Sequence, residues 1–419
     1  MTRRIDAAEW AAARRKAGPA PIALGQGVPR ATMWLIAFAV GVIVVNVTAP
    51  QTLVGVIAPD LGLPPRWAGL VGTAPLLGYA AGLFFLVPLS DLIENRGLVL
   101  ALLAAAVASA FAAAVTTAAL PFLALLFLLG AACSLIQVLV PIAAAMAREA
   151  ERGRVVGDVM AGLMVGILLS RPLASLVADA LGWRAFYLIA GAAMAGLAPL
   201  MLYRLPVRRP QVRLGYRALV ASLVTLVRTE PTLRRRALTA ALGMAAFTAF
   251  WTAVALRLAQ EPFGFDHRQI ALFALVGASG AVVTPLAGRA GDRGLDRPLL
   301  VAAHLAILLG LGLAALAGTL AYGPGLLLLG LGAVLLDIGV FVDQTLGRRA
   351  VNLLAAEARG RLNALFVGIF FLGGACGSAV AGLAWAAGGW TLVCAAAAGF
   401  GLLAVATGFL RTGFLRQPA

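Results

Sequence analysis

Long apolar runs recur along the chain and are separated by short polar segments. Each run holds about twenty residues, which is the helix length that the hydrocarbon core of a bilayer requires. Twelve such runs stand out: 31–57, 67–89, 98–117, 120–146, 156–179, 184–203, 238–257, 269–288, 298–319, 324–346, 364–386 and 390–411. The pattern predicts an all-α membrane protein with twelve transmembrane helices.

Composition supports the membrane assignment. Hydrophobic residues make up 62% of the chain and charged residues only 12%, whereas soluble domains carry about 25% charged residues. So few charges could not cover a soluble chain of this length. The first thirty residues are polar and basic, so we expect a cytoplasmic tail there and no cleavable signal peptide.

The basic residues are distributed unevenly between the two sides of the predicted membrane. With the N-terminus inside, 28 of the 33 fall in inner segments, four in outer segments and one, Arg171, within a span. This asymmetry predicts a multi-pass protein of the bacterial inner (plasma) membrane with both termini cytoplasmic. The formal charge of +16 is then explained by the anionic inner leaflet, and no nucleic-acid partner is needed.

Three short landmarks occur twice, in the same order, in the two halves of the chain. Pro-Leu-Ser at 88–90 recurs as Pro-Leu-Ala at 285–287, Arg-Gly-Arg at 152–154 recurs at 359–361, and Gly-Trp at 182–183 recurs at 389–390. The repeat predicts two pseudo-symmetric six-helix bundles with a substrate path between them. The expected divisions are an N-terminal tail (1–30), a first bundle (31–203), a basic linker (204–237), a second bundle (238–411) and a C-terminal tail (412–419). A short apolar stretch within the linker predicts an amphipathic helix on the inner surface.

The stretch 87–96 resembles the loop between helices 2 and 3 of the major facilitator superfamily, Gly-x-Leu-x-Asp-Arg-x-Gly-Arg-Arg. Leu89, Asp91 and Arg96 fall on that pattern, while Val87 and Glu94 replace its two glycines. In the fifth span, the glycines at 157 and 166 fit the spacing of the family's antiporter motif. The segments 162–171, 357–363 and 371–374 are similar to a bacterial subgroup known mainly for drug or metabolite efflux.

This resemblance covers about residues 31–411 and implies a secondary transporter that works by alternating access. The family's fourth helix carries an arginine that is linked to proton coupling, and Leu126 stands in its place here. We therefore expect other residues, on the fifth and tenth helices, to couple protons to transport.

Charged residues within a span are costly and usually face a cavity or a partner. Arg171 lies in the fifth span and is a candidate for binding an anionic group or for holding a carboxylate nearby. Asp337 lies near the middle of the tenth span, where a carboxyl group with little water around it can take up a proton. It could equally be a static partner of Arg171. Asp343 and Gln344, near the inner end of the same span, are candidates for wetting or gating the interface.

Polar side chains on the first, fourth and seventh spans are weaker candidates for lining the substrate cavity. Each could instead hydrogen-bond to a neighbouring helix. They are Asn46, Gln51, Gln137, Thr248 and Trp251. His304, on the ninth span, is expected to be a helix-packing residue.

Charged residues in the inner loops are candidates for gating. A carboxylate at the cytoplasmic mouth can bridge to the basic end of a neighbouring helix, and breaking such contacts biases the two access states. These loops could alternatively do no more than set the topology. The gating candidates are Asp91, Arg96 and Arg152 in the first half and Arg289, Asp292 and Arg293 in the second.

The function that the sequence favours is proton-coupled efflux of a small organic compound, such as a drug or metabolite, by a monomer. Uptake of an organic anion with Arg171 as its counter-ion is the alternative, and a membrane-embedded enzyme or lipid-handling protein is less favoured. No phosphate-binding Gly-x-x-x-x-Gly-Lys-Ser/Thr string occurs, and Lys16 is the only lysine. We expect no enzymatic activity, no cofactor and no metal site; the partners would be the substrate, protons and the bilayer.

Overall fold

The computed structural model describes residues 29–207, 215–355 and 358–409. Throughout these ranges the regular structure is helical and contains no strand. The tails expected at 1–30 and 412–419 lie outside the described residues, except for Pro29 and Arg30. The all-α fold class is confirmed.

The helices of the first half run from α2 to α9. They are α2 (Arg30–Thr48), η1 (Ala49–Gln51), α3 (Val54–Asp60), η2 (Pro65–Trp67), α4 (Leu70–Phe85), η3 (Val87–Asp91), α5 (Asn95–Val115), α6 (Ala119–Cys133), α7 (Ile136–Met146), η4 (Glu149–Glu151), α8 (Arg152–Leu181) and α9 (Trp183–Arg204). The linker contributes α10 (Tyr216–Thr229). The second half contains α11 (Pro231–Leu258), α12 (His267–Ala274), η5 (Leu275–Ala278), α13 (Ser279–Asp292), α14 (Asp296–Ala317), α15 (Tyr322–Asn352) and α16 (Arg359–Phe409).

Eleven helical segments of the described chain are long and apolar enough to cross a membrane. The last of them, Arg359–Gly408, contains two spans, because the backbone leaves the helical conformation at Gly388 and Gly389. Gly389 has φ of +61°, a conformation that glycine adopts without a steric penalty. Dividing this segment at the kink brings the number of spans to the twelve expected.

Several predicted spans are less regular than their apolar pattern indicates. The first was expected to continue to residue 57, but α2 ends at Thr48 and a 3-10 turn containing Pro50 follows. Proline has no backbone N–H to donate to the preceding turn, which favours a break there. The fourth span divides into α6 and α7 near Ser134, and the eighth into α12, η5 and α13.

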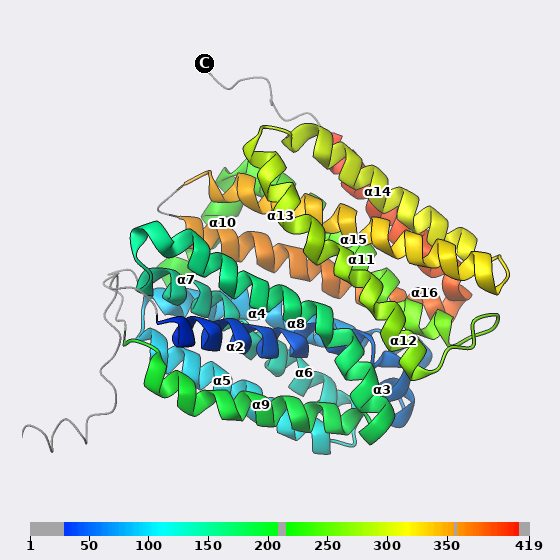
Figure 1. The fold of residues 1–419 in the computed structure, drawn as a ribbon, viewed down its shortest axis with the longest axis horizontal. Coiled ribbons are helices and arrows are strands. Elements are labelled where there is room, and N and C mark those ends of the chain that lie inside the picture. The colour runs from blue at the N-terminus through cyan, green and yellow to red at the C-terminus, as the bar shows by residue number, and fades with distance from the viewer. Residues whose placement is uncertain (1–28, 208–214, 356–357, 410–419) are drawn as a thin grey trace, which may run out of the picture.

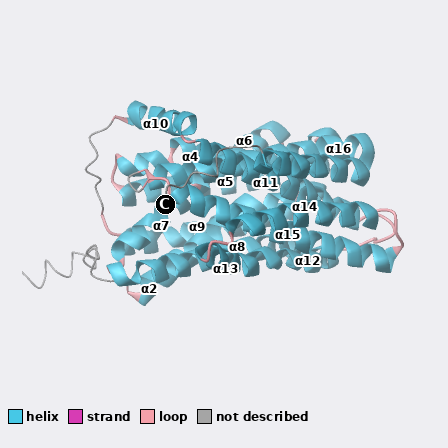
Figure 2. Ribbon diagram, turned by 90° about the horizontal axis from the view of Figure 1, so that it is seen from above, coloured by secondary structure: helices cyan, strands magenta, loops and turns pink. Residues whose placement is uncertain are grey.

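The helices pack in two groups, coloured blue to green and green to red in Figure 1. In the first half, α2 packs on α8, α4 on α6 and α5 on α9; in the second, α11 packs on α16 and α14 on α15. The groups meet along α4 with α16, along α8 with α12 and α13, and where η1 and α3 reach α11. Figure 1 and Figure 2 show that most helices run along the long direction of the molecule, with α12 and α13 inclined to α2 and α8.

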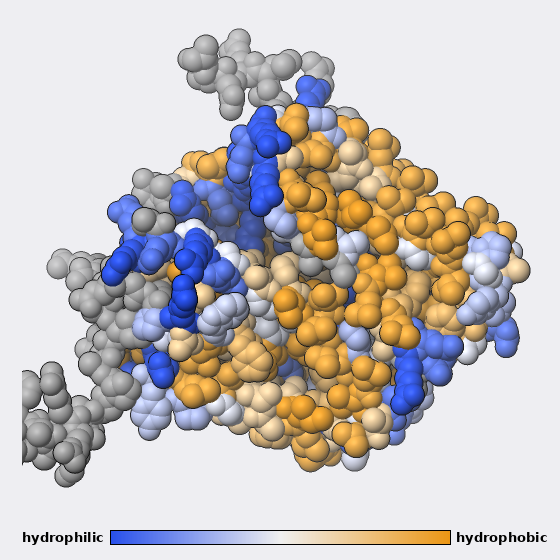
Figure 3. All heavy atoms as spheres, in the orientation of Figure 1, coloured by the Kyte–Doolittle hydropathy of each residue, from blue (hydrophilic) through white to orange (hydrophobic). Residues whose placement is uncertain are grey.

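The distribution of hydrophobic and hydrophilic residues on the surface is the one expected of a protein embedded in a lipid bilayer. On the face shown in Figure 3, hydrophobic residues cover the middle of the molecule, and hydrophilic residues gather at the two ends of the helices. Large apolar side chains such as Leu120, Val282 and Leu305 are exposed on helix surfaces. The chain is therefore a multi-pass membrane protein.

One end of the bundle carries η3, α10 and the start of α16, and is called the α10 end; the other carries α3, η2 and the α16 kink, and is called the α3 end (Figure 1). The helix α10 confirms that the linker contains a helix. Its buried residues, Leu219 and Leu223, face the protein, and Tyr216 donates a hydrogen bond to the carbonyl of Phe85. Because α10 contacts α4 and η3 as well as α11 and α16, it bridges the two halves.

The repeated Gly-Trp pair adopts the same local structure in both halves. Gly182 and Gly389 both have positive φ, and in both cases a new helix starts at the tryptophan that follows. The indole N–H groups of Trp183 and Trp390 donate to Asp60 Oδ2 and to the Ala314 carbonyl. The repeat therefore marks a turn whose tryptophan ties it to a neighbouring element.

The Asp60 carboxylate joins α3 to α9 at the α3 end. Arg184 Nη1 lies 2.5 Å from Asp60 Oδ2, and its guanidinium stacks on Trp183. The hydrogen bond from Arg184 lowers the pKa of Asp60. Asp60 is exposed, so this pair orders the surface rather than supporting the core.

At the α3 end the two halves touch backbone to backbone. A Cβ on Gly69 would lie 2.2 Å from the Ser378 carbonyl oxygen, and one on Gly382 would lie 2.7 Å from the Gly69 nitrogen. Ser378 also donates to the Gly69 carbonyl, and Thr73 donates to the Ala375 carbonyl. Only glycine allows so close an approach, so this end of the contact between halves is closed.

This close approach predicts that a methyl group at position 69 prevents the α3 end from closing. The Cβ of Gly69→Ala would meet the Ser378 carbonyl oxygen at 2.2 Å, and a backbone carbonyl cannot move aside as the end of a flexible side chain can. Gly69→Ala should therefore lose most of its transport, measured in proteoliposomes.

Gly196→Ala is the matched control, because a Cβ on this glycine of α9 would point into open space. It should transport as the wild type does. Full transport by Gly69→Ala would contradict the idea that the α3 end closes during the transport cycle.

Candidate functional site

A buried cluster of charged and aromatic residues lies between the two halves. Arg171, from α8, places its guanidinium carbon 4.3 Å from the centroid of the Trp251 ring and 5.2 Å from that of Phe247. Both aromatic residues belong to α11. Arg171 is only 4% exposed, so these ring faces replace part of the hydration that the guanidinium loses.

Trp251 also holds the carboxyl group of Asp337, from α15. Its indole N–H donates to Asp337 Oδ1 over 3.0 Å. Asp337 is fully buried, and its Oδ2, like Nε of Arg171, finds no hydrogen-bond partner among the described residues. Arg171 and Asp337 each therefore have a buried polar atom without a hydrogen bond in the same cluster.

The position of Gly277, in η5, shows how close these groups lie. A Cβ built on Gly277 would lie 3.2 Å from Asp337 Oδ2, 3.2 Å from Trp251 and 3.3 Å from Arg171 Nη1. No ion pair within 4.0 Å joins Arg171 to Asp337 in the described chain. Trp251 therefore connects the two charges, stacking on one and hydrogen-bonding to the other.

The structure thus brings together three residues expected to act in substrate binding or proton coupling: Arg171, Trp251 and Asp337. They come from three different helices and from both halves, because α8 meets the second half at this point. Phe247 and Gly277 complete the cluster. Neither residue was predicted from the sequence, although Phe247 lies one helical turn before Trp251 on the same helix.

Asp343 lies apart from this cluster. Its Oδ1 is 3.5 Å from Nε2 of His304, on α14, and both side chains are buried within the second half. Arg236, on α11, adds a positive charge near Asp343. The position expected to wet or gate the interface is thus paired inside one bundle, while Gln344, beside it, is partly buried.

Three of the weaker candidates, Asn46, Gln51 and Thr248, are buried and do not line the cavity at the α10 end. The Asn46 amide group donates to the carbonyls of Val42 and Ile43 on its own helix. Thr248 donates to the Gly374 carbonyl over 2.7 Å and so joins α11 to α16. Gln51 is 1% exposed, beside Gly72, and its amide group has no partner among the described residues.

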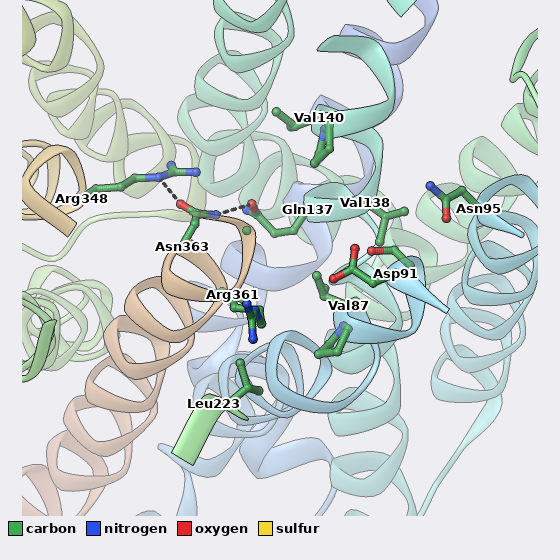
Figure 4. Close-up of a pocket in the computed structure, with 15 residues that line it drawn as sticks. Val87, Asp91, Asn95, Gln137, Val138, Val140, Leu223, Arg348, Arg361 and Asn363 are labelled. Carbon is green, nitrogen blue, oxygen red and sulfur yellow. Dashed lines mark hydrogen bonds between the residues drawn. The ribbon is translucent and has the colours of Figure 1, made fainter. Parts of the chain in front are cut away.

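Gln137 lines a cavity of about 360 Å³ at the α10 end, between the two halves. Figure 4 shows its amide in a chain of side chains. Arg348 Nε donates to Asn363 Oδ1 over 2.7 Å, and Asn363 Nδ2 donates to Gln137 Oε1 over 3.4 Å. Gln137 Nε2 then donates to the Tyr79 hydroxyl over 3.3 Å. The chain of bonds crosses from the second half to the first.

The gating candidates are spread over the α10 end. Asp91 lines the cavity, and Arg96 donates to the Leu202 carbonyl at the end of α9. Arg152 is exposed at the start of α8. The first-half candidates therefore do not form a single cluster.

In the second half, Asp292 accepts a hydrogen bond from Nε of Arg349 over 3.1 Å, and Arg349 also reaches Asp296. Arg289 and Arg293 are exposed in the same region. Arg349 is a residue that sequence analysis did not single out. Its position at the inner end of the tenth span, on the same side as the loop that carries Asp292 and Asp296, could have indicated it.

Comparison with known proteins identifies the family. The model of the Major Facilitator Superfamily matches residues 33–345. The chain belongs to the major facilitator superfamily. A superfamily relative, "Uncharacterized transporter YgaY" of Escherichia coli O157:H7, is 35% identical over 92% of this chain and 96% of its own. "Probable transporter SCO4007" of Streptomyces coelicolor is 33% identical over 92% of this chain and 88% of its own.

Solved superfamily structures share the fold. A bacterial homologue of the human lysosomal transporter Spinster, in an inward-facing and unoccupied conformation, superposes with a TM-score of 0.71. It is 14% identical, and the match covers 91% of this chain and 96% of that one. The family and these relatives make the chain a transporter of small molecules, not an enzyme.

The cluster predicts a specific effect of removing the Trp251 hydrogen bond. Trp251→Phe should lower the melting temperature, since an unsatisfied buried carboxylate oxygen costs about 1–3 kcal/mol, and should also impair transport. Trp390→Phe is the matched control, because it too removes an indole hydrogen bond but lies outside the cluster. Thermal unfolding of the purified proteins and transport in proteoliposomes are the measurements.

Trp390→Phe should lose stability without a comparable loss of transport per folded protein. Equal transport losses in the two variants would show that Trp251 acts only by supporting the fold.

Proposed function

We propose that this chain is a secondary active transporter that exports a small organic compound in exchange for protons. It would work by alternating access, with residues 31–203 and 238–411 moving as two bundles. The observation that supports the proposal best is the Arg171–Trp251–Asp337 cluster, in which opposite charges from opposite halves meet in the buried contact.

The cluster supplies what proton exchange requires. An ionised Asp337 is stabilised by the indole N–H and by the nearby guanidinium, and a hydrogen bond to a charged acceptor is stronger than one to a neutral acceptor. Protonation of Asp337 weakens both interactions and loosens the contact between halves at this depth. A substrate that binds Arg171 or Trp251 alters the same contact. Proton and substrate therefore act on a single equilibrium between access states.

The ends of the molecule fit such a cycle. The Gly69–Gly382 contact closes the α3 end, while the α10 end holds a cavity between the halves. The Gln137–Asn363 hydrogen bond and the Arg349–Asp292 pair are contacts that could break and reform. We assign the α10 end to the cytoplasm, because the basic residues concentrate there, and place the protein in the bacterial inner membrane.

Uptake of an organic anion is the second candidate function. It is favoured by Arg171, which is buried with no carboxylate within 4.0 Å among the described residues. A substrate carboxylate could supply that missing partner. Export and uptake use the same cluster and differ in whether the substrate crosses the membrane in the opposite direction to the proton or in the same direction.

Replacing Asp337 tests the proposal. Proteoliposomes with an imposed pH gradient and an internal pH-sensitive dye are given a panel of organic acids, neutral drugs and amines. The wild-type protein should move protons in response to at least one compound. Asp337→Asn should abolish gradient-driven transport of that compound but retain its binding and its exchange across the membrane without a gradient.

Asp158→Asn is the control, because Asp158 lies on the surface of α8 and pairs with Arg154 of the same helix. Gradient-driven transport that survives in Asp337→Asn would refute the role of this carboxylate. A compound that drives proton flux outward together with its own exit would refute exchange.

A further inference from the structure

The cavity at the α10 end contains charged groups that the proton-exchange cycle does not use. Its walls come from η3 and α7 in the first half, from α15 and α16 in the second, and from α10, which lies across both (Figure 4). Two arginines, Arg348 and Arg361, line it. With a volume of about 360 Å³, it can hold a small organic molecule but is too small for a large drug.

Neither arginine has an acidic partner in the described part of the chain. No carboxylate lies within 4.0 Å of Arg348 or Arg361 there. Arg348 is partly buried and uses Nε to bond Asn363, while Arg361 uses Nη1 to bond Ser222 of α10 over 2.9 Å. Both partners are neutral, so no described carboxylate pairs directly with either guanidinium, and each has N–H groups that bond to no described residue.

Neighbouring amides hold the Arg348 guanidinium in place. The chain from Asn363 through Gln137 to Tyr79 is anchored in the first half and fixes the orientation of the Asn363 oxygen that Arg348 contacts. A guanidinium held by Nε presents its remaining N–H groups in one plane, the geometry that binds a carboxylate in a bidentate manner.

The other walls are mainly apolar. Val87, Val138, Val140 and Leu223 line the cavity together with two prolines. Asp91 lies on the opposite wall from Arg348 in Figure 4, and it is engaged in a contact of its own. Its negative charge disfavours a second anionic group at that side of the cavity.

We propose that this cavity is a binding site for a small organic monoanion, with its carboxylate on Arg348 and Arg361 and its apolar body against the valines and Leu223. The inference rests on the proposed transport function and narrows its substrate class to amphiphilic monocarboxylates. The anion binds at the α10 end first, and Arg171 lies deeper along the contact between the halves. Two guanidinium groups thus mark the entrance and the middle of one path.

Direct binding tests this site without requiring transport. The probe is 2-naphthoate, and its neutral counterpart 2-naphthamide has the same ring and nearly the same shape. Calorimetry on the full-length protein in a neutral detergent should show saturable binding of 2-naphthoate and at least tenfold weaker binding of the amide. Arg348→Gln and Arg361→Gln should each weaken naphthoate binding by about tenfold or more, because each removes a charge-assisted hydrogen bond.

Arg217→Gln is the matched control, since Arg217 is exposed on α10 at the same end of the molecule. It should bind 2-naphthoate as the wild type does. Equal affinity in Arg348→Gln, Arg361→Gln and the wild type would overturn the proposal, and so would equal affinity for the acid and the amide.

An anionic lipid headgroup could present similar chemistry, and a second arm of the experiment separates the two sources. Binding is repeated in nanodiscs of phosphatidylcholine alone and of phosphatidylcholine with phosphatidylglycerol. Naphthoate should bind in both with similar affinity. Loss of naphthoate binding in the anionic discs, restored by removing phosphatidylglycerol, would assign the arginines to lipid and overturn the proposal.

The outcome is also distinguishable from that of the proton-exchange proposal. Asp337→Asn should bind 2-naphthoate at this site, since Asp337 does not line the cavity. Proton-driven transport that depends on Asp337, together with 2-naphthoate binding that is unchanged in Arg348→Gln and Arg361→Gln, would leave the exchange cycle intact and refute the anion site. Naphthoate binding that depends on the two arginines, without any proton-driven transport, would support the anion site and refute the exchange cycle.

Discussion

The contact between Arg171, Trp251 and Asp337 is the constraint on which the account of this transporter depends. Each charge is buried, and a buried charge is tolerated only where opposite charge, hydrogen bonds or aromatic faces replace water. Here Trp251 contacts both charges: its ring stacks against the guanidinium of Arg171, and its N–H donates a hydrogen bond to the carboxylate of Asp337. Arg171 belongs to the first half, whereas Trp251 and Asp337 belong to the second. The first bundle therefore depends on the second to replace the water around its buried charge.

The rest of the fold brings these groups together. Glycines allow α4 and α16 to touch at the α3 end, and Gly277 leaves room for the three side chains where η5 meets α8. At the α10 end the halves meet through longer polar side chains around a cavity, and α10 spans both. Opening the α3 end requires closely packed backbones to separate. Opening the α10 end requires only hydrogen bonds between side chains to break. That asymmetry is what a rocking transporter needs.

The sequence predicted the fold well because lipid imposes a simple rule. Apolar runs of about twenty residues gave the number of helices. The repeated Gly-Trp pair marked the same turn in both halves. The irregular helix around Pro50 and the division of α6 from α7 were not predicted, because apolar periodicity does not report on local breaks. Hydrophobicity also could not tell that Thr248 serves helix packing whereas Trp251, three residues on, faces a charge.

The sequence indicated which charged residues belong to the site, because charges within spans are rare. It did not indicate which residues contact them. Arg171 and Asp337 stood out because a membrane rarely tolerates them, but nothing in one sequence shows that Trp251 joins them or that His304 pairs with Asp343. The most direct test is a double-mutant cycle of Arg171→Gln and Asp337→Asn on the melting of the purified protein. If the two charges act as one unit, each single variant is destabilised and the double variant is more stable than the sum of the two losses predicts, by about 0.5–3 kcal/mol. Strictly additive losses would show that the two charges are independent and would contradict the account.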